Sequence, residues 1–129
     1  MKKIFTLFAA LVCMMSVSAK TVYLVPGPWN VDGAKFSIYS IKTNSFSDFL
    51  TSTDGTHYEA TIADDTQVIF VRHDGSATTP SWDNKWNQTA DLDVPADKNC
   101  YTVTGWGLND GTSCVYSTED PEPSTGVTY

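Results

Sequence analysis

The chain is poor in positive charge. It contains 8 Lys and Arg residues against 15 Asp and Glu residues among 129, which gives a formal net charge of −7. Two of the basic residues are Lys2 and Lys3 near the N-terminus, and without them the net charge is −9. Because such a surface repels polyanions, nucleic acid and anionic lipid are poor candidates as partners, whereas neutral ligands or cations fit.

Long apolar runs are equally scarce. The longest covers residues 4–15, which is too short for a comfortable membrane span. Lys2 and Lys3 precede this run, and the small residues Val17, Ser18 and Ala19 follow it. That order is typical of a secretory signal, so we expect residues 1–19 to be removed on export. The remaining protein is expected to be secreted, periplasmic or extracellular, without a membrane contact.

Cysteine is limited to three residues, and Cys13 lies inside the predicted signal. Cys100 and Cys114 lie in two strand-like segments joined by a glycine-rich turn. An oxidising exterior permits a disulfide between them, and two buried free thiols are the alternative that the sequence leaves open. There is no CxxC motif and no histidine near either cysteine, so we expect no metal site.

Catalytic patterns are absent from the sequence. There is no G-x-S-x-G, H-E-x-x-H or Cys–His arrangement. A glycosidase needs two carboxylates facing each other across a cleft. Asp91 and Asp93 share one face of a short strand, but the solvent side of an edge strand explains them more simply. We therefore expect a protein without catalytic residues or cofactors, and not an enzyme.

What the sequence does contain is a series of short strand-like segments. Turn residues such as Asp54-Gly55 and Asp74-Gly75 recur about every 10 residues, and no segment keeps a helical period. This rhythm predicts one all-β sandwich over residues 20–118. Residues 119–129 contain PEPSTG and are expected to form a flexible tail or the start of a linker. The predicted strands are residues 21–25, 34–41, 57–62, 67–72, 90–94, 100–105 and 114–117.

The polar segment at residues 81–92, SWDNKWNQTADL, contains two tryptophans, Trp82 and Trp86. Proteins that bind sugars place such rings flat against the C–H face of a pyranose, while neighbouring amides and carboxylates bond its hydroxyls. The alternative is that one or both rings fold back and fix a long loop. We expect Trp29 to cap the end of the sandwich and Trp106 to rest on the sheet as a hairpin residue.

Several segments together resemble a known family. YLVPGPWNVDGAKFSIYSI, HYEATI, VIFVRHDG, WDNKWNQTADL and NCYTVTGW are similar to the family-26 starch-binding carbohydrate modules associated with secreted bacterial α-amylases. The likeness covers about residues 21–106. It implies an immunoglobulin-like β-sandwich of about seven short antiparallel strands. It also implies a monomer that binds α-1,4-glucan polysaccharide or malto-oligosaccharide through exposed aromatic rings and amides.

The resemblance also implies part of a site. Tyr39 matches a strand tyrosine that stacks on sugar, and Gln88 matches a glutamine that bonds sugar hydroxyls. This chain has Ser37 where the family has a second tyrosine, and Phe46 or Phe49 where the family has a stacking tryptophan. These departures predict either weak affinity or a site in which the tryptophans of residues 81–92 have taken over the stacking.

The predicted carbohydrate site therefore joins residues from the resemblance to residues from the polar segment. His73 is included as a possible partner for a hydroxyl, with a solvated turn histidine as its alternative. Three classes of function stay open: an α-glucan-binding module, an adhesin-like or protein-binding sandwich that has lost the sugar site, and, least favoured, a small hydrolase with an unrecognised site. The first requires Tyr39, Gln88 and at least one of the two tryptophans to meet on one exposed patch. The predicted members are Tyr39, Phe49, His73, Trp82, Trp86 and Gln88.

Overall fold

A computed structural model describes residues 19–63, 67–95 and 97–117. These residues form nine strands and two short 3₁₀ helices, with no α-helix and hence no helix able to cross a membrane. The predicted signal, apart from Ala19, and the predicted tail lie outside the described residues. The elements are β1 (Ala19–Val25), η2 (Gly27–Trp29), β2 (Lys35–Ser40), β3 (Ser45–Phe46), β4 (Tyr58–Ala63), β5 (Gln67–His73), η3 (Trp82–Asn84), β6 (Lys85–Gln88), β7 (Leu92–Asp93), β8 (Cys100–Val103) and β9 (Gly111–Cys114).

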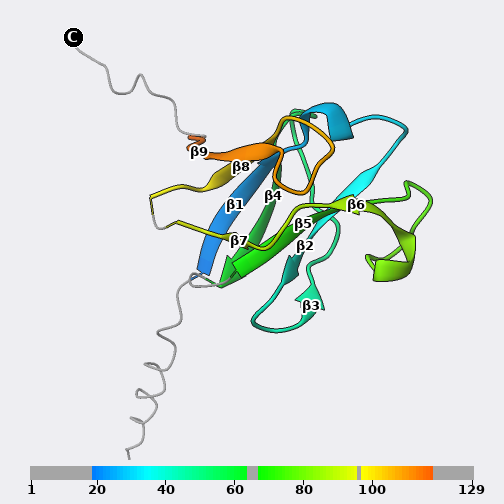
Figure 1. Cartoon of the computed structure of the whole chain (residues 1–129), viewed down its shortest axis with the longest axis horizontal. Coiled ribbons are helices and arrows are strands. Elements are labelled where there is room, and N and C mark those ends of the chain that lie inside the picture. Colours follow the sequence, from blue (N-terminus) through cyan, green and yellow to red (C-terminus); the bar gives the residue numbers. More distant parts are fainter. Residues whose placement is uncertain (1–18, 64–66, 96, 118–129) are drawn as a thin grey trace, which may run out of the picture.

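The strands form two sheets in a sandwich-like arrangement (Figure 1). The first sheet has the order β4-β1-β8-β9, and the second has the order β3-β2-β5-β6, with β7 also paired to β5. The prediction of an all-β fold in two layers is confirmed, and the immunoglobulin-like strand order stays a prediction. The prediction of purely antiparallel strands is wrong, because β1 and β8 are parallel. The long excursion of the chain through the other sheet provides the crossover that a parallel pair requires.

Alternating apolar residues of both sheets fill the space between them. Phe70 of β5 and Tyr101 of β8 stack across this space, with ring centroids 5.5 Å apart, and Phe36 of β2 meets Tyr58 of β4 edge to face at 5.0 Å. Burial of these side chains is the main force that holds the sheets together. The buried cluster consists of Val22, Leu24, Trp29, Phe36, Ile38, Leu50, Val68, Phe70, Tyr101 and Val103.

Strand β5 lies in the middle of its sheet, as its apolar sequence predicts. Val68 and Phe70 point into the core, while Ile69, Val71 and His73 lie on the outer face and are still buried. An outer face that excludes water must be covered by other residues. The segment 74–84 and strand β3 lie on this side of the molecule, and both contribute residues to the candidate site (Figure 1).

Two strand assignments from sequence are corrected. The last strand runs over Gly111–Cys114 and not over residues 114–117, because β9 pairs with β8 from Val103 opposite Gly111 to Cys100 opposite Cys114. This register brings the two cysteine Cα atoms to 4.7 Å, and they form a disulfide. Strand β6 was not expected as a separate strand. Its polar residues hide the pattern of a strand that pairs along the edge of β5.

Candidate functional site

The register of the second sheet places several predicted site residues on its outer face. Tyr39 of β2 lies opposite Ile69 of β5 and opposite Phe46 of β3, and Gln88 of β6 lies opposite Val71 of β5. Residues directly opposite each other on neighbouring strands share a face of the sheet. Tyr39, Phe46 and Gln88 therefore face the same side, away from the core.

Three aromatic rings pack on one another on this outer face. The ring of Trp82 lies 4.8 Å from that of Tyr39 and 4.8 Å from that of Phe46, and the rings of Tyr39 and Phe46 are 5.0 Å apart. The planes are tilted by 56–67° relative to one another. Trp82 is 41% exposed and the other two rings are half-buried. Tyr39, Phe46 and Trp82 form a faceted surface open to water, called here the aromatic surface.

The segment 74–84 carries Trp82 onto this surface. At its start Gly75 lies so close to Gly33 that a Cβ on Gly75 would stand 2.1 Å from the Gly33 carbonyl oxygen, so no side chain fits there. Lys35 Nζ donates to the carbonyl oxygen of Ala77 at 2.7 Å. The Asp74 carboxylate accepts from the backbone N–H and the hydroxyl of Ser76, which lowers the pKa of that carboxyl. The segment is thus tied to β2 and to the turn before it.

His73 and Asn84, at the two ends of the same segment, are joined by a hydrogen bond. Asn84 Oδ1 accepts from Ser81 N at 3.2 Å, and Asn84 Nδ2 donates to Thr79 O at 2.9 Å. Asn84 Oδ1 also lies 2.6 Å from His73 Nδ1. Because an amide oxygen can only accept a hydrogen bond, Nδ1 carries the proton. Nε2 then accepts from Ser37 Oγ at 2.7 Å. Burial lowers the pKa of the His73 imidazole, so both contacts describe a neutral ring.

His73 is fully buried and is not exposed to a ligand. The prediction that it contacts sugar is wrong, and so is the alternative of a solvated turn residue. Its ring lies 5.7 Å from Phe46 and 5.4 Å from Phe49, beneath the rim of the aromatic surface. Sequence reasoning missed this supporting role, because the partners Ser37 and Asn84 lie 36 and 11 residues away along the chain.

Sequence reasoning did not consider two lysines that lie against aromatic rings, Lys85 beside the aromatic surface and Lys35 beside Phe49. Lys85 Nζ lies 5.7 Å from the ring centroid of Trp82 and donates to Gln88 Oε1 at 2.8 Å. Lys35 Nζ lies 5.2 Å from the ring of Phe49. A β-bulge between Arg72 and His73 brings Lys85 and Gln88 to the same face although they are three residues apart. Simple alternation along a strand would have placed them on opposite faces.

Trp86 does not join the aromatic surface. Its ring lies over the Arg72 guanidinium, with the Cζ atom 4.8 Å from the ring centroid. The predicted residues Tyr39, Trp82 and Gln88 therefore lie on one face. Phe49 packs on the buried His73 ring, and Trp86 lies over Arg72. Phe46, given from the resemblance as one of two possible ring positions, is the one that packs against Trp82.

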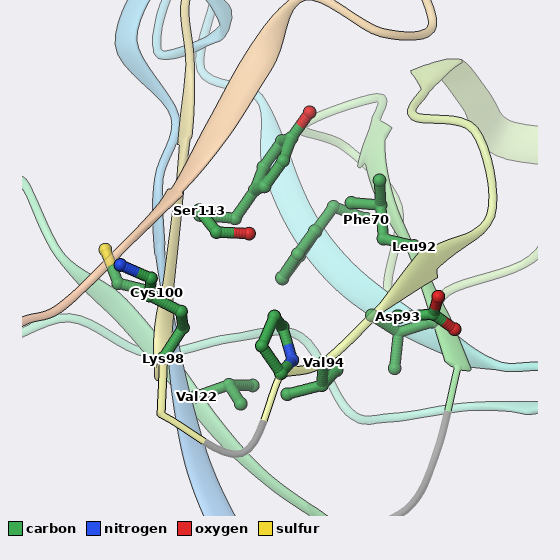
Figure 2. A pocket seen from close by; sticks show the side chains of 11 residues that line it. Val22, Phe70, Leu92, Asp93, Val94, Lys98, Cys100 and Ser113 are labelled. Atoms are coloured by element: carbon green, nitrogen blue, oxygen red, sulfur yellow. The ribbon is translucent and has the colours of Figure 1, made fainter.

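Two hollows in the described residues differ in size and lining. Figure 2 shows a pocket of about 20 Å³ on which Val22, Phe70, Leu92 and Val94 converge, and this volume holds about one water molecule. A second hollow of about 190 Å³ shares Phe46 with the aromatic surface, and its lining combines apolar surface with hydroxyl-bearing residues. Its hydroxyl-bearing lining residues are Ser40, Thr43, Ser45, Ser47 and Thr61. No group of three or more metal-ligating side chains occurs in the described ranges.

No protein-family model, curated protein or solved structure matches this chain. The fold and the site define a small all-β domain with exposed aromatic residues.

Proposed function

We propose that this protein is a secreted, non-catalytic carbohydrate-binding module that binds α-glucan at the aromatic surface, as its resemblance to the family-26 starch-binding modules implies. One observation carries the proposal: Tyr39, Phe46 and Trp82 come from three different segments and pack together on an exposed face, with the amide of Gln88 on that face. A cluster of large aromatic side chains on an exposed face is typical of a binding surface.

The chemistry of the surface fits a neutral sugar chain. The rings offer apolar faces to the C–H face of a pyranose, and Gln88 and Lys85 supply groups that bond hydroxyls. Because the ring planes are tilted by 56–67°, they suit the curved chain of an α-1,4-glucan better than the flat ribbon of a β-1,4-glucan. The net charge of −9 without the signal lysines disfavours acidic polysaccharides.

The expected affinity is modest. Each ring–sugar stack contributes about 0.5–1.5 kcal/mol by analogy with other aromatic contacts. Two such stacks and two or three hydrogen bonds at about 1 kcal/mol each must offset the cost of association. Micromolar to millimolar dissociation constants follow, which suits a module that tethers a protein to a polymer. The disulfide between Cys100 and Cys114 agrees with an oxidising, exported location.

Affinity electrophoresis of the purified protein tests the proposal. We expect gels containing amylopectin, glycogen or pullulan to retard the protein, and a xylan gel to leave it unaffected. Trp82→Ala should abolish most of the retardation, because it removes the most exposed of the three rings, and Trp82→Phe should keep part of it. Val115→Ala is the matched control, since Val115 is 66% exposed but follows β9 of the other sheet. Unchanged mobility of the wild type in all four gels would overturn the starch proposal and favour a protein-binding sandwich.

A further inference from the structure

A second group of exposed rings lies at the other side of β6. Trp86 of β6 and Trp106 of the β8–β9 connection are 43% and 53% exposed. Both rings lie over the Arg72 guanidinium, with Cζ 4.8 Å from the centroid of Trp86 and 5.1 Å from that of Trp106. The two centroids therefore lie within about 10 Å of each other. We call these two rings the tryptophan pair.

Arg72 serves as a fixed support for the tryptophan pair. It is only 6% exposed, and Nε donates to Trp29 O at 2.7 Å while Nη2 donates to Val31 O at 3.0 Å. Nη1 points at Asn87 Oδ1, 3.4 Å away. The guanidinium N–H groups thus donate to acceptors of the protein, and the positive charge holds the indoles by cation–π attraction. Rings that are already immobilised lose little conformational entropy when a ligand binds.

The surroundings of the tryptophan pair combine flat apolar rings with a polar acceptor. The Asp32 carboxylate lies 3.6 Å from Arg72 Nη2, and its side chain is 76% exposed. A carboxylate on this rim accepts hydrogen bonds from hydroxyl groups. A pyranose presents both a C–H face for an indole and hydroxyls for such an acceptor, and its neutrality agrees with the acidic surface of the chain.

The tryptophan pair is also close in the chain to the aromatic surface. Trp82 and Trp86 are four residues apart, so their Cα atoms are separated by no more than about 14 Å even in a fully extended chain. At the bulge, β6 has Trp86 as an extra residue opposite the step from Arg72 to His73, so Lys85 and Gln88 lie on the outer face while the Trp86 ring lies over Arg72. A polymer that rests on Trp82 can therefore continue across the edge strand β6 to Trp86.

We propose that the tryptophan pair is a second binding surface for the same neutral polysaccharide, engaged when one glucan chain crosses β6. This inference rests on the proposed function of the aromatic surface. Linking two weak surfaces through one polymer raises the affinity for the polymer, whereas a ligand too short to reach both surfaces gains nothing.

Comparison of a short and a long glucan tests the inference on the full chain. Retardation in amylopectin gels measures polymer affinity, and maltose titration followed by NMR measures binding of a ligand too short to span both surfaces. Trp106→Ala is expected to weaken amylopectin binding about two- to tenfold and to leave maltose binding at the aromatic surface unchanged. Leu108→Ala is the matched control, because Leu108 is 54% exposed in the same connection. Trp86→Ala is expected to behave like Trp106→Ala. Thermal unfolding shows whether each variant is folded, and if Trp86→Ala does not fold, the result for Trp106→Ala decides.

The outcomes separate this inference from the proposed function. If Trp82→Ala weakens amylopectin binding and Trp106→Ala does not, the second surface is refuted and the aromatic surface stands. If Trp106→Ala weakens maltose binding as much as amylopectin binding, the rings belong to a single site and the inference is overturned. A change of oligomeric state in Trp106→Ala on gel filtration, without a change in amylopectin binding, assigns the tryptophan pair to self-association and also overturns it. If the wild type binds no glucan, the proposed function itself fails.

Discussion

Removing the Asn84 side chain is the sharpest test of how the aromatic surface is built. Asn84 Oδ1 accepts from His73 Nδ1 and from Ser81 N, and Asn84 Nδ2 donates to Thr79 O. Asn84→Ala breaks all three hydrogen bonds and leaves the N–H of a fully buried imidazole unpaired. With about 1 kcal/mol for each of the bonds to Ser81 and Thr79 and about 1–3 kcal/mol for the unsatisfied buried donor of His73, the free energy of unfolding should fall by about 3–5 kcal/mol.

Urea unfolding followed by tryptophan fluorescence measures this change. Asn30→Ala is the matched control, because the Asn30 side chain makes a single exposed hydrogen bond, from Nδ2 to Gly55 O at 3.1 Å. That variant should lose no more than about 1 kcal/mol. Amylopectin binding should also weaken in Asn84→Ala, since Trp82 sits in the segment that Asn84 closes. Equal free energies of unfolding for the two variants would refute the view that this network holds the segment in place.

Two further predictions concern pH and redox state. Burial holds the pKa of His73 below its ordinary value of 6.5, so the unfolded chain takes up this proton at a higher pH than the folded protein. The contribution of His73 to stability is therefore complete above pH 6.5 and declines as the pH falls from there to the folded pKa. Urea unfolding at about pH 7.5 and about pH 5 should show this loss of stability in the wild type and a smaller loss in His73→Gln. The disulfide closes a sequence separation of 14 residues, so the Cys100→Ser, Cys114→Ser double variant should lose about 3 kcal/mol by the chain-entropy argument. An unfolding midpoint that does not respond to a reductant would contradict this expected loss of stability.

Much of the sandwich could be predicted from local sequence. Alternating apolar residues in β2 and β4, and the doubly apolar β5, mark strands because the side chains of a strand alternate between two faces. Turn residues then separate the strands. The same reasoning placed Tyr39 on the face opposite to Phe36 and Ile38, where the structure has it. The parallel pairing of β1 with β8 carries no such local signature, because it depends on how distant strands meet.

The two tryptophans of residues 81–92 show where sequence reasoning ends. Trp82 and Trp86 both have polar neighbours. The local sequence favours Trp82 as the ligand-contacting ring, because it follows Pro80 in a loop, and Trp86 as the packed one, because it precedes the next predicted strand, but it does not say what either ring contacts. The bulge opposite Arg72 and His73 makes Trp86 the extra residue of β6, and its ring lies over Arg72, whereas Trp82 in η3 packs with Tyr39 and Phe46. A bulge is a property of a strand pair and not of either strand alone.

By itself the sequence determined the β class, the net negative charge and the presence of rings with no apolar partners nearby, because each of these depends on composition or on neighbouring residues. Only the tertiary structure decided which rings meet. It buried His73 between Ser37 and Asn84, and it put Trp106 beside Trp86 on one guanidinium. These contacts join residues that are far apart in the chain, and their geometry exists only once the two sheets have packed.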